Sequence, residues 1–151
     1  MLANTCSFGI PKDSIAKGTY CAGGEMIRKV LLVDDDHDLR EIIAEYLEGN
    51  GYKVIQATNG ADALKTLTRD GPSFVALITD NDMPALPGEG LILAMANSGI
   101  ELPLKVLISG HALPDAKVQE MGFKYGTCVL SKPFDNSELL KILDEFEVTS
   151  S

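Results

Sequence analysis

The hydrophobic pattern of this chain consists of short apolar runs separated by longer segments with helical spacing. Residues 30–33, 74–79 and 105–108 are almost wholly apolar, which is typical of parallel strands that are buried on both faces. Apolar and polar residues alternate over residues 52–57, and a short apolar run covers residues 128–130. The pattern therefore predicts five strands.

Amphipathic helices are expected between these strands. Residues 39–47 carry apolar side chains three or four positions apart, and Gly49-Asn50-Gly51 ends this predicted helix. Ser137 is expected to be the N-cap of the last helix. Strands that alternate with helices predict an α/β fold, a doubly wound parallel sheet with helices on both faces. The remaining helices are expected at residues 61–68, 91–97, 114–121 and 137–146.

The length of 151 residues corresponds to one domain. Residues 1–25 contain four glycines, balanced charges and no hydrophobic period, so we expect a flexible N-terminal extension. The domain is predicted to span residues 26–148, with residues 149–151 as a short tail.

Charge and cysteine content narrow the functional classes. The chain has 13 basic and 22 acidic residues, a net charge of −9, which argues against binding to nucleic acid or to an anionic membrane surface. Its apolar runs are far shorter than the ~20 residues that a membrane span requires. Three cysteines (Cys6, Cys21 and Cys128) have no metal-binding spacing, which favours free thiols in a reducing compartment.

Polar residues gather at the carboxyl ends of the predicted strands. Ligands bind at this edge of a parallel sheet, so we expect these residues to lie close together. They are Asp34-Asp35-Asp36 after the first strand, Asp80-Asn81-Asp82 after the third, Ser109-Gly110-His111 after the fourth and Ser131-Lys132 after the fifth.

This set of side chains favours phosphate chemistry. Two carboxylates about 4 Å apart repel each other by roughly 4 kcal/mol at an effective dielectric constant of about 20, unless a cation lies between them. Mg²⁺ suits one or two carboxylates together with phosphate oxygens. Lys132 would attract an incoming anion, and Ser109 could donate a hydrogen bond to it. A carboxylate beside both cations is then a competent nucleophile toward phosphorus.

At these residues the chain resembles the receiver domains of response regulators in two-component signalling. The separations from residue 35 to 80, 80 to 109 and 109 to 132 are 45, 29 and 23 residues, which fit that family, and the similarity covers about residues 27–148. The resemblance implies a flavodoxin-like (βα)5 fold with strand order 2-1-3-4-5. It is carried by Val30-Leu-Leu-Val-Asp-Asp-Asp36, Ile78-Thr-Asp-Asn-Asp-Met-Pro84, Val106-Leu-Ile-Ser-Gly110 and Leu130-Ser-Lys-Pro-Phe134.

The resemblance also implies a role for each acidic residue at the strand ends. Asp80 would accept a phosphoryl group and would be a ligand of Mg²⁺. Asp35 would bind the ion directly, and Asp34 would bind it largely through water. The backbone carbonyl of Asp82 would be a further ligand.

The implied reaction is transfer of a phosphoryl group from a sensor histidine kinase or a phosphotransfer protein. Ser109 would hydrogen-bond the phosphoryl group, Lys132 would pair with it, and the Lys132–Pro133 peptide bond is expected to be cis. Phosphorylation of Asp80 would bias a two-state docking surface made by the fourth helix, the fifth strand and the fifth helix. The protein would not be an enzyme acting on other substrates, and its location would be cytoplasmic.

Three positions depart from the usual family pattern. Val129 replaces the aromatic residue that commonly lies three positions before the lysine, which puts coupling through an aromatic rotation in doubt. Asp82 adds negative charge two positions after the acceptor. His111 could face the site and make the lifetime of the phosphoryl group depend on pH, although an ordinary loop position is the simpler interpretation.

Other functions fit parts of the pattern. Asp34 as nucleophile and Asp36 as general acid are typical of aspartate-nucleophile phosphatases, but these need a further acidic pair at a later strand end. A flavin carrier shares the topology but requires a hydroxyl-rich phosphate loop after the first strand, where this chain has three acids. The acidic residues from Asp34 to Glu45 partly match a calcium loop, yet Leu39 stands where that loop requires glycine.

Only 17 residues follow Phe134, so no output domain is expected. The chain is interpreted as a stand-alone receiver that docks onto an unidentified downstream protein. A partner with a basic face would complement its negative charge. Whether the chain forms a homodimer is left open.

Overall fold

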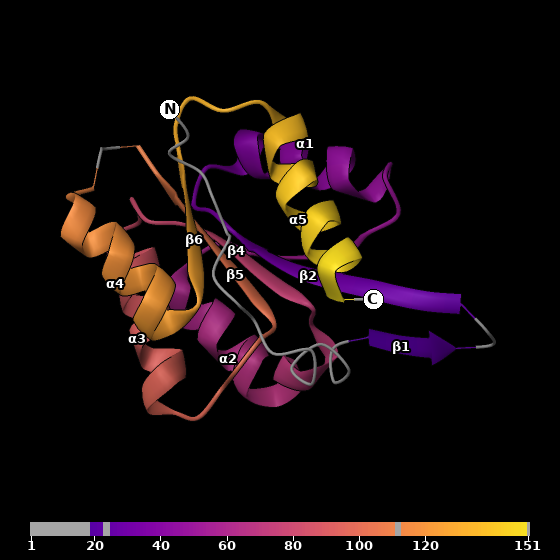
Figure 1. Ribbon diagram of the computed structural model, residues 1–151, viewed down its shortest axis with the longest axis horizontal. Helices are drawn as coiled ribbons and strands as arrows, with labels where there is room; N and C mark the ends of the chain where they lie inside the picture. The colour runs from indigo at the N-terminus through magenta and orange to yellow at the C-terminus, as the bar shows by residue number, and fades with distance from the viewer. Residues whose placement is uncertain (1–18, 23–24, 111–112, 151) are drawn as a thin grey trace.

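The computed structural model describes residues 19–22, 25–110 and 113–150, which form one sheet flanked by helices (Figure 1). None of the helices in these ranges is long and apolar enough to cross a membrane. The strands are β1 (Thr19–Ala22), β2 (Glu25–Val33), β3 (Lys53–Ala57), β4 (Ala76–Asp80), β5 (Leu104–Ser109) and β6 (Thr127–Ser131). The helices are α1 (His37–Glu48), α2 (Gly60–Asp70), the 3-10 turn η2 (Gly71–Ser73), α3 (Gly88–Asn97), α4 (Asp115–Tyr125) and α5 (Asn136–Ser150).

Five of the strands form the parallel sheet that the sequence predicts. β2 lies between β3 and β4, and β5 and β6 continue the sheet beyond β4. Counted along the chain without β1, the spatial order is 2-1-3-4-5, which confirms the flavodoxin-like topology. The carboxyl ends of all five strands therefore lie along one edge.

Alternate residues of the central strand β2 contribute to two separate apolar layers. Val30 and Leu32 pack in the layer with α1 and α5, whereas Leu31 and Val33 pack in the layer with α2, α3 and α4. All four side chains are at most 1% exposed. The unbroken apolar run therefore reflects helices on both faces of the sheet, and this burial holds the strand ends in place.

The helix ends are set by local hydrogen bonds. Asp36 is the N-cap of α1, and its side chain accepts a hydrogen bond from the backbone N–H of Leu39. The prediction that Ser137 is the N-cap of α5 is wrong, because Ser137 lies within the first turn of that helix. The side chain of Glu138 accepts the backbone N–H of Asp135 at 2.9 Å, an interaction that starts the helix earlier than the apolar stripe indicates.

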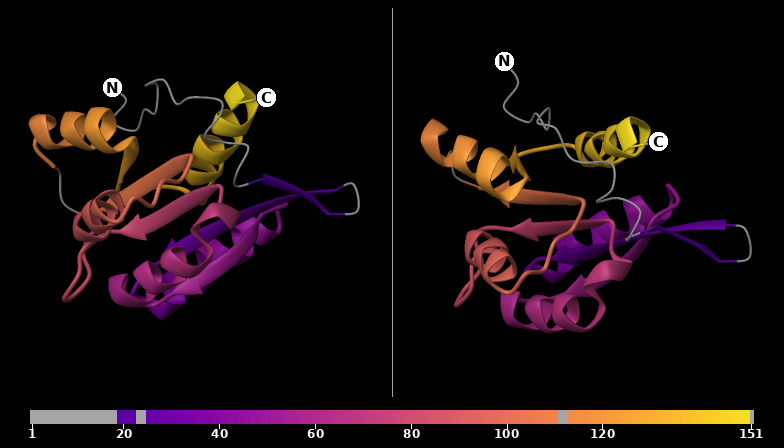
Figure 2. Two further views of the ribbon diagram at one scale, coloured as in Figure 1. Left: turned by 90° about the horizontal axis from the view of Figure 1, so that it is seen from below. Right: turned by 60° about the horizontal axis from the view of Figure 1, so that its bottom comes forward.

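Part of the predicted N-terminal extension is a strand. Thr19–Ala22 pairs antiparallel with residues 25–28, the first half of β2, and this hairpin projects beyond the rest of the sheet (Figure 2). Residues 1–18 and 23–24 lie outside the described residues. The pairing satisfies backbone groups and requires no apolar periodicity, so the sequence pattern did not predict it.

Cys128 of β6 is 1% exposed and packs in the layer with α1 and α5, as expected for a small core residue. Its sulfur forms a disulfide bond, so the prediction of a free thiol is wrong for this residue. Cysteine count and spacing do not give the distance between sulfur atoms, which decides whether a disulfide forms.

We predict that Gly88→Ala destabilises the domain by about 1–3 kcal/mol, because the added methyl group overpacks the junction of α3 with the sheet. A Cβ at this position would lie 2.7 Å from the carbonyl oxygen of Asp80 and 2.6 Å from a side-chain carbon of Leu107. Urea unfolding measures the change. Gly49→Ala is the control, since Gly49 has helical φ and ψ and its Cβ would be 3.4 Å from its nearest neighbour. Equal unfolding midpoints for the two variants would contradict the prediction.

Candidate functional site

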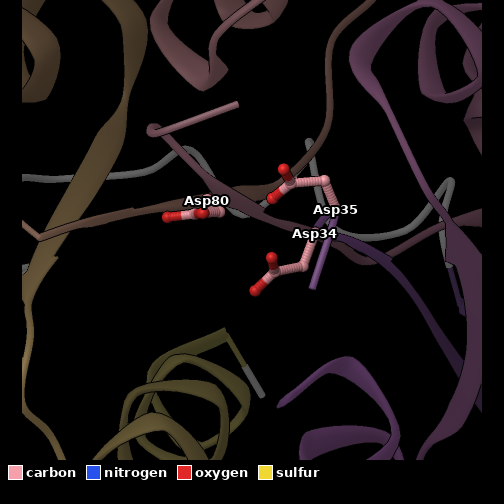
Figure 3. A group of neighbouring side chains, drawn as sticks. All are labelled: Asp34, Asp35 and Asp80. Carbon is pink, nitrogen blue, oxygen red and sulfur yellow. The ribbon is translucent and has the colours of Figure 1, made fainter. Parts of the chain in front are cut away.

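The carboxylates that follow β2 and end β4 lie side by side. Val33 pairs with Thr79, so Asp34 and Asp80 are the next residues along two neighbouring strands. One carboxylate oxygen from each of Asp34, Asp35 and Asp80 lies within 4.8 Å of the others. Figure 3 shows these three side chains extending to the same side of the strand ends. The acids therefore converge, as the strand-end pattern predicts.

Asp34 is almost completely buried, at 2% exposed. Its Oδ1 accepts the backbone N–H of Asp36 at 2.9 Å. Burial raises the pKa of Asp34 from 3.8 to about 6; the hydrogen bond from Asp36 opposes this rise and the charge of Asp80 adds to it. The site thus contains a carboxyl group that holds its proton more strongly than an exposed acid does.

A buried arginine supports the loop that carries these acids. Arg40 is 6% exposed, and its Nη1 donates to the carbonyl oxygen of Asp34 at 2.8 Å. Its Nε donates to Gln56 at 2.8 Å, and its Nη2 lies 3.0 Å from Nδ1 of His37. Sequence reasoning missed this residue. Its signal was a charged side chain on the inner face of the helix, four positions after the N-cap Asp36.

Asp80 faces a lysine from the end of β6. It is 3% exposed, and its Oδ1 lies 3.2 Å from Nζ of Lys132. Burial raises the pKa of Asp80, and the charge of Lys132 opposes this rise. Oδ1 still lacks a well-formed hydrogen bond from any described residue. The Lys132–Pro133 peptide bond is cis, as expected.

Ser109 is the last residue of β5 and is 1% exposed. Asp80 pairs with Ile108, so Ser109 follows the residue beside Asp80. The carbonyl of Ser109 accepts the backbone N–H of Lys132 at 2.9 Å. The hydroxyl-bearing residue and the lysine are therefore fixed to each other through the main chain, next to the strand that carries Asp80.

The side chains of the two residues after Asp80 form hydrogen bonds with different parts of the fold. Oδ1 of Asn81 accepts the backbone N–H of Glu89 in α3 at 2.9 Å. Asp82 donates its backbone N–H to the carboxylate of Asp80, and its own Oδ2 accepts the backbone N–H of Gly110 at 2.9 Å. The exposed Asp82 side chain thus links the loop after β4 to the loop after β5, a contact that sequence spacing does not give.

The other candidate residues are placed elsewhere. The side chain of Asp36 caps α1, which directs it away from the general-acid role that a phosphatase would need. Asp36, Asp38 and Glu45 do not belong to the carboxylate group that could hold a metal. Val129 is buried in the apolar layer with α2, α3 and α4. The hypothesis that His111 faces the site cannot be compared with the structure, because this residue lies outside the described residues.

The chemistry of the site fits a hard divalent cation. Three carboxylates share a small space with one ammonium group, and a buried oxygen of Asp80 is short of a partner. Asp35 is exposed, so water can reach one side of the cluster. Oxygen ligands at a partly hydrated site are those that Mg²⁺ prefers.

We predict that the metal-free protein loses stability as the pH rises from about 4 to about 7. Because the pKa of Asp34 is raised to about 6, the folded state binds more protons than the unfolded state in this range. The contribution is on the order of 2–3 kcal/mol, present below the unfolded pKa and lost above the folded one. Urea unfolding in a chelator at several pH values measures it.

Asp34→Asn imitates the protonated acid, so it should reduce this pH dependence and stabilise the metal-free protein near pH 7. Glu48→Gln, an exposed position on α1, is the control and should keep the wild-type profile. An Asp34→Asn profile that follows the wild type across the whole range would show that the pKa of Asp34 is not raised.

The chain is similar in sequence to proteins of known class. Response regulator MprA of Mycobacterium leprae is 35% identical over 113 residues, which is 74% of this chain and 47% of the relative. MprA of Mycobacterium ulcerans is 34% identical over 113 residues, again 74% of this chain and 47% of the relative. The chain therefore spans about half the length of the curated relatives that it matches, and the expectation of no output domain stays a prediction.

Solved structures agree with this similarity. The receiver domain of the Francisella response regulator 1452 matches with a TM-score of 0.70 and 27% identity, over 81% of this chain and 98% of that one. Chemotaxis protein CheY4 of Vibrio cholerae matches with a TM-score of 0.68 and 30% identity, over 80% of this chain and 98% of that one. The sequence model of the family of response regulator receiver domains matches residues 30–144 of this chain. Since this match spans most of the chain and the strand order agrees with it, the chain belongs to the family of response regulator receiver domains.

Proposed function

We propose that Asp80 accepts a phosphoryl group from a sensor histidine kinase or a phosphotransfer protein. One observation supports this assignment above the others. Asp80 is the buried carboxylate that approaches both the acids after β2 and, at 3.2 Å, the ammonium group of Lys132. An attacking carboxylate needs cationic neighbours on the side from which the phosphate arrives, because two anions otherwise repel each other.

Mg²⁺ would be held by Asp35, by Asp34 largely through water, by Asp80 and by the backbone carbonyl of Asp82. When bound, it neutralises charge on the acids and on the phosphate oxygens. Arg40 supports this ligand set from behind, since it fixes the carbonyl of Asp34 without taking up a carboxylate oxygen.

In the proposed step, a carboxylate oxygen of Asp80 attacks the phosphorus of a phosphohistidine. The new O–P bond forms as the N–P bond breaks, and the electron pair of that bond returns to the imidazole, which leaves with a proton from its surroundings. Lys132 pairs with the transferred group, and the hydroxyl of Ser109 donates a hydrogen bond to one of its oxygens. The protein is thus a stoichiometric acceptor, and we do not propose that it acts as an enzyme on other substrates.

The acyl phosphate would then shift the docking surface made by α4, β6 and α5 toward its active arrangement. Phosphorylation adds charge and three strong acceptor oxygens, and it can only favour a conformation that the chain already samples. With Val129 buried in the core, an aromatic rotation at that position is not part of this proposal. The downstream partner would be a protein with a basic face, and the proposal places these events in the cytoplasm.

We predict that incubation with phosphoramidate and Mg²⁺ adds the mass of one phosphoryl group to the wild type and none to Asp80→Asn. The substitution keeps the size of the side chain but removes the nucleophilic oxygen. Intact-mass measurement gives the result directly, and circular dichroism checks that the variant is folded. Asp70→Asn, an acid at the opposite end of α2 from the strand ends, is the matched control and should be phosphorylated like the wild type. A full mass gain in Asp80→Asn would assign the acceptor elsewhere.

A further inference from the structure

Asp82 makes a contact that the proposed phosphoryl transfer does not use. Its Oδ2 accepts the backbone N–H of Gly110 at 2.9 Å, across 28 positions of sequence. A hydrogen bond to an ionised carboxylate is stronger than one to a neutral acceptor. This contact therefore holds together the loops that follow β4 and β5.

The same N–H lies near the lysine that contacts Asp80. A Cβ built on Gly110 would lie 2.9 Å from Oδ2 of Asp82 and 3.8 Å from the Cδ atom of Lys132, whose Nζ contacts Asp80. Gly110 also follows Ser109 directly. The exposed carboxylate of Asp82 is thus an anion that already occupies a donor at the edge of the proposed phosphoryl site.

We infer that Asp82 acts as an internal competitor for the phosphoryl group, an inference that rests on the proposed function of Asp80. In the unphosphorylated protein, its carboxylate occupies the Gly110 N–H and holds Gly110, the first residue after β5, in the inactive arrangement. A phosphoryl group on Asp80 repels this carboxylate and offers its own oxygens to the same donor. Exchange of the Gly110 N–H from Asp82 to the phosphoryl group then accompanies the switch.

A second link defines the region that this exchange can move. Asn81 binds the first turn of α3 through Glu89, and Oε1 of Glu89 lies 3.2 Å from Nζ of Lys117 in α4. Asp82 thus contacts Gly110 at the β5 end of the connection to α4, whereas Asn81 reaches the α4 end only indirectly, through Glu89. Breaking the Asp82 contact releases only the end nearest the phosphoryl group.

The Asp82–Gly110 contact should weaken the binding of a phosphoryl mimic. A contact present only in the unphosphorylated state lowers the apparent affinity for a phosphoryl mimic, because binding must break it. Removing the acceptor should therefore tighten binding of beryllium trifluoride, a mimic of the phosphoryl group, by about three- to tenfold.

Asp82→Ala and Asp82→Asn form the decisive pair. Both remove the negative charge, but only Asn keeps an oxygen that can accept the Gly110 N–H. If Asp82 competes through this hydrogen bond, affinity for beryllium trifluoride in the presence of Mg²⁺ rises from wild type to Asn and again to Ala. Equal affinities for the two variants would reduce the effect to charge alone and would overturn the inference.

Solvent exchange of the Gly110 amide, followed by NMR in the Mg²⁺-loaded and unphosphorylated protein, tests the contact itself. Exchange should be about tenfold faster in Asp82→Ala than in the wild type. Lys117→Met, which breaks only the second link, should leave the exchange unchanged. If both variants accelerate it equally, the protection comes from general anchoring of α4 and the inference fails.

Failure of the inference can be told apart from failure of the proposed function. A wild-type protein that gains no phosphoryl mass and binds no beryllium trifluoride would remove the function of Asp80. A wild type that binds the mimic while Asp82→Ala binds it equally or more weakly would overturn only the role of Asp82.

Discussion

The site depends on two carboxylates that the fold holds buried next to each other. Asp34 and Asp80 are 2% and 3% exposed at the ends of adjacent strands. Burial disfavours the charged form of each, and each raises the cost of ionising the other. Such a pair persists because the apolar layers on both faces of the sheet fix the strands and leave their ends no alternative position. The packing of the core thus sets the electrostatics of the site.

The neighbouring polar groups act on this pair in two different ways. Arg40 and the N–H of Asp36 bind the Asp34 side of the cluster, where they order the loop. Lys132 lies on the Asp80 side of the cluster, where its charge faces that carboxylate. The first kind of contact makes the geometry rigid, and the second leaves a cation available to an incoming anion. Together they give a site that is ordered but still short of positive charge.

Sequence reasoning predicted the parts of this arrangement that depend on periodicity. Apolar runs located the five parallel strands, and the polar residues at their ends identified Asp34, Asp80 and Lys132 as neighbours. It missed Arg40, the Gly110 contact of Asp82 and strand β1. Arg40 was visible only as a charged position on the inner face of its helix, and periodicity does not say which groups such a side chain binds. The Asp82 contact depends on a side-chain direction between two loops, and β1 depends on backbone pairing, so neither of these leaves a periodic signal.

Under the proposed function, the contacts of the two residues after Asp80 offer a route from this carboxylate to the surface that needs no aromatic switch. Asn81 binds α3 and, through Glu89, α4, whereas Asp82 binds the loop after β5. All of these contacts are polar and lie at the strand-end edge, outside the apolar core that contains Val129. Close-packed cores resist small displacements, but hydrogen bonds at a partly exposed edge can exchange partners at little cost. Coupling in this chain is therefore expected to run along the loops, and the core beneath them serves as the fixed frame against which they move.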